Sequence, residues 1–164
     1  MRIAIGCDHI VTSMKNDIRD YLIDIGYEVL DVGTYDEKRT HYPIYGQRIG
    51  ELVASGVVDI GVAICGTGVG ISNSVQKVKG TRVALVSDVI TAIKAKEDFN
   101  ANVISFGGRV VGMGTAVDII DNFLAAQYLG KNADKIEFIN SIGNESPVSF
   151  DEHLEKWDKG FYVD

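Results

Sequence analysis

The chain has 164 residues, of which 46% are hydrophobic and 24% charged, a composition typical of a single soluble globular domain with a substantial core. No apolar run approaches the roughly 20 residues that a membrane-spanning helix needs, and Asp8 interrupts the apolar region that a signal peptide would have. The net charge of -7 argues against extended nucleic-acid binding. Two cysteines without metal-ligand spacing fit a reducing compartment, so we expect a cytoplasmic protein with no membrane segment, disulfide or metal site.

Short apolar segments alternate with amphipathic ones along the chain, which predicts parallel βαβ units. Strands are expected at residues 2–6, 27–32, 59–64, 82–86 and 102–106. Helices are expected from about residue 13 to 25, from Pro43 onward, and at 71–78, 89–96 and 115–126. Weaker patterns predict a helix at 131–142, a loop at 143–149 and a short helix at 150–157.

The first helix illustrates how these elements are expected to pack. Its apolar residues recur at helical spacing and are expected on one buried face: Met14, Ile18, Leu22 and Ile25. Gly26 follows in the position that glycine favours after a helix. We therefore predict a doubly wound, Rossmann-like α/β fold, with a five-stranded parallel sheet flanked by helices at residues 1–128. A C-terminal helical extension at 129–164 is expected to belong to the same domain and to contact another subunit.

A glycine-rich loop follows the third expected strand and carries the strongest functional signal, with the sequence ICGTGVG at residues 64–70. Its glycines let backbone N–H groups approach an oxyanion without a Cβ in the way. Cys65 stands at the start of this loop as a potential acid, base or nucleophile, and Thr67 adds a hydroxyl. The loop therefore resembles half of an active site.

Polar residues also follow the first and fifth expected strands, namely Asp8 with His9, and Arg109 after a pair of glycines. Ligands of doubly wound sheets bind outside the carboxyl ends of the strands, so these groups are expected to converge with the Cys65 loop. Arg39 and His41 flank Thr40 in a long polar loop and could reach a phosphate.

Each of these residues also has a purely structural interpretation. Cys65 could be a small buried hydrophobic residue, as we expect Cys7 to be. Asp8 could cap a helix, and Arg39 could be solvated. The glycines are not a dinucleotide fingerprint, because that motif follows the first strand, and the loop lacks the lysine of a phosphate-binding loop.

Four blocks of the sequence resemble the family of B-type ribose-5-phosphate isomerases and galactose-6-phosphate isomerases: GCDH at 6–9, RTHYP at 39–43, ICGTGVGI at 64–71 and FGGRVVG at 106–112. The resemblance extends from residue 1 to about residue 128. It implies interconversion of aldose and ketose phosphates through a cis-enediolate, without a metal or cofactor.

The resemblance also implies roles for individual residues. Cys65 would move the proton between adjacent sugar carbons. Thr67 and the loop residues Gly66, Gly68, Val69 and Gly70 would stabilise the enediolate oxygens. The sugar phosphate would be bound by Asp8, His9 and Arg109, with Arg39 nearby.

The chain departs from the family pattern at two places. Asp98 and Phe99 stand where family members have a His-Asn pair used for ring opening, and Asn132 and Ile136 stand where two arginines clamp the phosphate. Neither side chain can replace a bidentate arginine. The tail LEKWDKG at 154–160 resembles a chain of the two-subunit galactose-6-phosphate isomerase.

These departures imply that an A-type subunit of galactose-6-phosphate isomerase supplies the missing histidine and arginines. The resemblance implies a small sugar-phosphate substrate, with D-galactose 6-phosphate converted to D-tagatose 6-phosphate. Two alternatives stay open. One is a homodimeric ribose-5-phosphate or allose-6-phosphate isomerase, and the other is a non-catalytic module that binds a sugar phosphate or nucleotide.

Overall fold

The computed structural model describes residues 1–142, 152, 155–156 and 159–160. Its strands are β1 (Arg2–Cys7), β2 (Glu28–Asp31), β3 (Ile60–Cys65), β4 (Val83–Leu85) and β5 (Val103–Gly107). Its helices are the short 3₁₀ helix η1 (His9–Val11) and the α-helices α1 (Thr12–Asp24), α2 (Tyr42–Ala54), α3 (Val69–Gln76), α4 (Val89–Phe99), α5 (Met113–Ala125) and α6 (Ala133–Ser141). The chain divides into two compact units, Met1–Lys131 and Asn132–Asp164.

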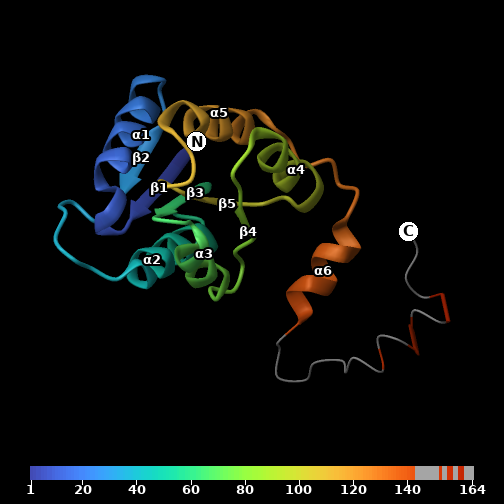
Figure 1. Ribbon diagram of the computed structural model, residues 1–164. Coiled ribbons are helices and arrows are strands. Elements are labelled where there is room, and N and C mark those ends of the chain that lie inside the picture. The colour runs from blue at the N-terminus through green and yellow to red at the C-terminus, as the bar shows by residue number, and fades with distance from the viewer. Residues whose placement is uncertain (143–151, 153–154, 157–158, 161–164) are drawn as a thin grey trace. The chain divides into compact units, whose positions relative to one another are not determined.

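The first unit is built on one parallel sheet, as the alternating pattern predicted. Its strand order is β2-β1-β3-β5-β4, and each neighbouring pair is parallel. Helices cover both faces, with α1, α4 and α5 on one side and α2 and α3 on the other (Figure 1). The prediction of a doubly wound α/β fold is confirmed.

The two faces of the sheet pack differently because side chains alternate along each strand. Large residues such as Ile5, Val62 and Phe106 point toward α1, α4 and α5, where they form the larger of the two cores. The opposite face carries small residues such as Gly61, and a Cβ there would lie 2.5 Å from Ile49 of α2. Small residues on this face therefore let α2 and α3 pack close to the sheet.

Several predicted boundaries are wrong by a few residues. Helix α1 is preceded by η1 and ends before Ile25, whose side chain is exposed rather than on the buried face. Strand β2 is shorter than 27–32, and β4 is shorter than 82–86. Helix α4 continues to Phe99, past the expected end at residue 96. Gly26 does follow α1, with a φ of +96°.

Two boundary differences affect the candidate site. Strand β3 runs one residue further than expected and includes Cys65, because Cys65 still pairs with Gly107 of β5. Helix α3 starts at Val69 rather than at residue 71, so Val69 and Gly70 form its first turn. Gly68 precedes this helix in the left-handed conformation, with a φ of +80°.

A buried ion pair joins α1 to the end of β2. Lys15 is fully buried and its ammonium contacts the carboxylate of Asp31. The Arg19 guanidinium lies 3.1 Å from the same carboxylate, and the other Asp31 oxygen accepts from the Gly33 N–H at 2.9 Å. The pair therefore anchors the start of the polar loop that leads to Arg39.

The second unit contains α6, which matches the helix expected at 131–142 and has no buried residue. The predicted loop at 143–149 lies outside the described residues. So does most of the predicted helix at 150–157, of which residues 152, 155 and 156 are described and helical. That this extension forms part of the same domain stays a prediction. No helix in the described residues is both long and apolar enough to cross a membrane.

Candidate active site

The carboxyl ends of three neighbouring strands, β1, β3 and β5, bring the predicted groups together. Cys7 pairs with Ile64 and Cys65 pairs with Gly107, so the residues that follow each strand are adjacent. The chain leaves β1 through α1 to β2 at one edge of the sheet, and it leaves β3 through α3 to β4 at the other edge, so the two connections diverge between β1 and β3. Such a switch point is where open α/β sheets bind ligands.

The sulfur of Cys65 is held by the turn that follows it. The Gly68 N–H donates a hydrogen bond to Cys65 Sγ at 3.1 Å, and the residue is 4% exposed. Helix α3 begins at the next residue, and the N-terminus of a helix attracts negative charge. Thr67 Oγ1 accepts from the Val69 N–H at 3.4 Å. Negative charge on or beside the sulfur is therefore stabilised by fixed backbone dipoles.

The loop is fixed to the end of β5 by three hydrogen bonds. The buried Ser105 hydroxyl donates to the Gly68 carbonyl at 3.0 Å. The Gly108 N–H donates to the Cys65 carbonyl at 2.9 Å, and the Arg109 N–H donates to the Gly66 carbonyl at 3.1 Å. These bonds leave the loop little freedom to adjust, so its dipoles are pre-organised.

The three glycines of the loop differ in what a side chain at each position would contact. A Cβ on Gly66 would meet nothing closer than 3.9 Å, and its nearest neighbours are the side chains of Arg109 and Ile10. A Cβ on Gly68 would lie 2.7 Å from the Phe106 carbonyl carbon, and one on Gly70 would lie 2.5 Å from the Tyr42 ring. Close packing against backbone therefore requires a glycine at position 68, whereas a Cβ on Gly70 would displace the exposed Tyr42 ring and one on Gly66 would meet little.

Asp8 and His9 follow β1 at this edge. Asp8 is buried, and its Oδ1 accepts from the Ile10 N–H at 3.0 Å, which makes it the cap of η1. This is the structural interpretation that the sequence left open. His9 is half-buried, and its Nδ1 accepts from the Thr40 N–H at 3.3 Å. Thr40 thereby brings the polar loop that carries Arg39 beside His9.

Arg39 and Arg109 are the exposed cations of this edge. Arg109 Cδ is 3.9 Å from the Cβ position of Gly66, and Arg39 precedes the residue that contacts His9. Neither guanidinium forms an ion pair with a carboxylate in the described part of the chain. Both guanidinium groups therefore lie exposed at this edge, in a protein with a net charge of -7.

Cys7 lies in the core, as expected. It is fully buried, and this burial raises the pKa of its thiol to about 11, although the positive charge of Lys15 opposes the shift. In the described residues, no three His, Cys, Asp or Glu side chains are grouped in a way that could hold a metal ion.

Of the residues at the departures from the family pattern, Asp98 and Phe99 lie away from Cys65 within the first unit. Asp98 and Phe99 end α4, which leads into the amino end of β5, whereas Cys65 lies at the carboxyl edge of the sheet. In the second unit, Asn132 precedes α6 and Ile136 lies within it.

Sequence reasoning missed three residues that shape the site. Tyr42 covers Gly70, Ser105 holds Gly68, and Tyr45 contacts Thr40 through its hydroxyl, with 3.1 Å between Tyr45 Oη and Thr40 Oγ1. A signal existed for Ser105, because it is a polar residue inside an apolar strand. No pattern distinguishes Tyr45 from any other aromatic residue of an amphipathic helix.

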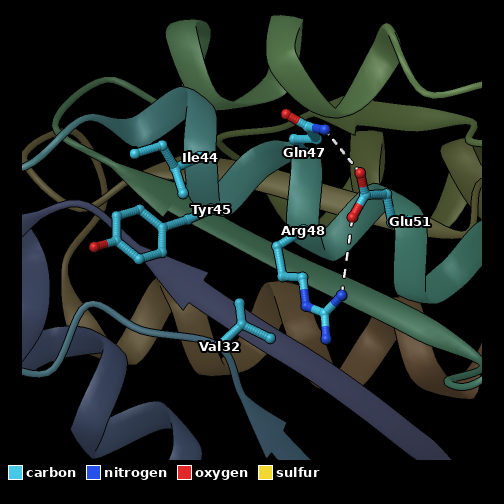
Figure 2. Close-up of a pocket in the computed structure, with 6 residues that line it drawn as sticks. All are labelled: Val32, Ile44, Tyr45, Gln47, Arg48 and Glu51. Carbon is cyan, nitrogen blue, oxygen red and sulfur yellow. Dashed lines mark hydrogen bonds and ion pairs between the residues drawn. The ribbon is translucent and has the colours of Figure 1, made fainter.

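Tyr45 also lines a groove of about 300 Å³ beside α2, with Val32, Ile44, Gln47, Arg48 and Glu51 (Figure 2). Gln47 and Glu51 share a hydrogen bond of 2.7 Å across the polar side of this groove. The groove does not include Cys65 or its loop, so it is a different feature from the candidate active site.

Comparison with known proteins identifies the class of proteins to which this fold and site belong. The Ribose/Galactose Isomerase family matches residues 3–139. The chain belongs to this family and is an aldose–ketose isomerase of sugar phosphates.

Individual relatives make the comparison more specific. The chain is 54% identical to the galactose-6-phosphate isomerase subunit LacB of Clostridium acetobutylicum, over 99% of this chain and 98% of that protein. It is 42% identical to ribose-5-phosphate isomerase B of Escherichia coli, over 86% of this chain and 95% of that one. A solved structure of ribose-5-phosphate isomerase B from Clostridium thermocellum superposes with a TM-score of 0.85 at 40% identity, covering 87% of this chain and 97% of that one.

Proposed function

We propose that this chain is the cysteine-bearing subunit of a heteromeric galactose-6-phosphate isomerase, which interconverts D-galactose 6-phosphate and D-tagatose 6-phosphate. The observation that carries the proposal is the setting of Cys65. Its sulfur accepts from the Gly68 N–H at 3.1 Å, at the start of α3 and beside the Thr67 hydroxyl. Binding alone would not need a thiol in such a setting.

In the proposed reaction, the Cys65 thiolate takes the proton from C2 of the open-chain aldose. The C2–H electron pair forms the C1–C2 double bond, and the C1 carbonyl oxygen becomes the enediolate oxygen. Thr67 Oγ and N–H groups of the loop stabilise this developing charge. The thiol then returns its proton to C1 while the O2 proton passes to O1, which gives the ketose. No oxidant, reductant or cofactor is needed for this balance.

The exposed cations at this edge of the sheet support a phosphorylated substrate. Arg109 lies at the mouth beside Gly66, and His9 and Arg39 border the same edge. Local cations of this kind are needed because the net charge of -7 repels an anionic sugar. His9 Nε2 and the guanidinium groups can donate to phosphate oxygens. Asp8 would act mainly through the η1 backbone that it caps.

The distance between the two edges of the sheet supports a divided site. A group at residue 98 or 99 is separated from Cys65 by the length of β5, about 13 Å at 3.3 Å per residue. A ring-opening group at that position could therefore not serve Cys65 of the same chain. We propose that an A-type subunit supplies the ring-opening histidine and the phosphate-binding arginines.

Exposed apolar side chains around the site also support a partner. Tyr42, Val69, Leu85 and Val110 are each at least 40% exposed, and each contacts or belongs to the segments that frame Cys65. Exposed apolar groups rimmed by polar ones commonly mark a protein interface. The relative with the highest identity reported above is itself named as a subunit.

The test is reconstitution. The chain alone should not turn over galactose 6-phosphate, whereas a mixture with an A-type subunit should. In that mixture, Cys65→Ser should lower kcat by at least about 10²-fold, the range expected for loss of an acid–base group. Cys7→Ser, at the other buried cysteine, is the matched control and should keep the activity.

Three outcomes would overturn parts of the proposal. Turnover of ribose 5-phosphate or galactose 6-phosphate by the chain alone, in a sample shown by mass spectrometry to lack a partner, would favour the homodimeric alternative. Binding of sugar phosphates without turnover in any mixture would favour the non-catalytic module. Near-normal kcat in Cys65→Ser would remove this thiol from the reaction.

A further inference from the structure

A chain of hydrogen bonds connects His9 to a tyrosine outside the mouth of the site. The Thr40 N–H donates to His9 Nδ1 at 3.3 Å, and Thr40 Oγ1 lies 3.1 Å from the Tyr45 hydroxyl. Tyr45 belongs to the first half of α2, while His9 belongs to η1, so the chain of bonds joins two elements far apart in sequence.

The bond to Nδ1 decides which nitrogen of His9 can donate. A neutral imidazole carries one proton, and the nitrogen that accepts a hydrogen bond cannot hold it. With Nδ1 accepting from Thr40, the proton is on Nε2. The nitrogen that remains for a ligand is therefore a donor, which is what an anionic phosphate oxygen requires.

The Tyr45 ring is well placed to hold this arrangement. It is half-buried against the core beneath α2, and its Cε1 lies 2.9 Å from the Cβ position of Gly33. Figure 2 shows its hydroxyl pointing away from the polar groove residues Gln47, Arg48 and Glu51. The hydroxyl is thus directed to Thr40 and not shared with the polar side of the groove.

We propose that Tyr45 is a positioning residue for substrate binding, which acts through Thr40 to keep His9 in the tautomer with the proton on Nε2. The inference rests on the proposed function, because it assigns the Nε2 donor to the phosphate of the sugar. Tyr45 does not touch the substrate. Its role is to fix the Thr40 backbone where its N–H meets Nδ1.

The first measurement is the tautomer itself, by ¹⁵N NMR of the chain labelled at its three histidines, with the His9 signals assigned from a His9→Gln variant. The wild-type chain should show His9 protonated on Nε2. Tyr45→Phe, which keeps the ring, and Thr40→Val, which keeps the shape, should both populate the Nδ1-protonated form. Tyr35→Phe is the matched control: it removes a hydroxyl that donates to the Asp31 carbonyl in the same loop, and it should change nothing at His9.

The second measurement is kinetic, in the reconstituted enzyme. Tyr45→Phe should raise KM for galactose 6-phosphate about 3- to 10-fold, the effect of weakening one hydrogen bond, with a smaller change in kcat. An unchanged His9 tautomer in Tyr45→Phe would overturn the inference whatever the activity. A changed tautomer with an unchanged KM would overturn the role in substrate binding.

Failure of the proposed function has a different signature. The wild-type mixture would then be inactive on galactose 6-phosphate. The NMR measurement on the chain alone needs neither partner nor substrate, so it would still decide whether Tyr45 sets the His9 tautomer.

Discussion

Replacing Gly68 with alanine should destabilise the fold even in the absence of substrate or partner. Gly68 has a φ of +80°, where an L-residue is strained by about 1–2 kcal/mol. Its new Cβ would also lie 2.7 Å from the Phe106 carbonyl carbon and 2.9 Å from the Gly107 nitrogen. These backbone atoms cannot move aside cheaply, and overpacking of this kind costs about 1–3 kcal/mol. We therefore expect Gly68→Ala to lower the free energy of unfolding by about 2–5 kcal/mol.

Gly66→Ala is the matched control, two residues away in the same loop. Its Cβ would have no neighbour closer than 3.9 Å, and its φ is not in the left-handed region. The free energy of unfolding should therefore stay within about 0.5–1 kcal/mol of the wild type. Urea unfolding of the isolated chain, followed by circular dichroism, measures both variants. A Gly68→Ala variant within 1 kcal/mol of the wild type, or a Gly66→Ala variant equally destabilised, would refute the packing argument.

Two further predictions concern buried ionisable groups. Burial raises the pKa of the Cys7 thiol from near 9 to about 11, so the unfolded chain loses this proton at lower pH than the folded one. The free energy of unfolding should therefore fall by up to roughly 2–3 kcal/mol as the pH rises from about 9 to 11. The Cys7→Ala variant should not show this contribution to the fall. An equal pH dependence of the free energy of unfolding in the two proteins would contradict the prediction. Asp31→Asn should destabilise the chain by about 3–5 kcal/mol in urea unfolding, because it leaves the fully buried Lys15 ammonium without its carboxylate. Lys15→Met should lower the free energy of unfolding by less, because Asp31 still has the Arg19 guanidinium at 3.1 Å. An equal decrease in both variants would contradict this prediction.

Local sequence determined the elements of the first unit and the position of the candidate catalytic thiol. Apolar runs of β-forming residues predicted all five strands. The three central strands β1, β3 and β5 are buried on both faces and are therefore apolar along nearly their whole length, whereas the edge strands β2 and β4 are partly exposed. The Cys65 loop was found the same way, since its glycines and thiol are adjacent in the chain. The boundary errors arose where a neighbouring element decides, as at Cys65, which remains in β3 because Gly107 pairs with it.

Contacts between distant residues were decided only by the tertiary structure. Gly68 and Gly70 looked like glycines for ligand approach, but their neighbours Phe106 and Tyr42 come from other elements. Asp8 caps η1, and the sequence alone could not distinguish this capping role from a role in substrate binding. The bonds from Tyr45 through Thr40 to His9 depend on how α2 packs against the sheet, because hydrogen-bond partners 31 residues apart leave no periodic trace in the sequence. Periodicity along the chain reports which side of an element is buried, and it says nothing about which particular group lies opposite.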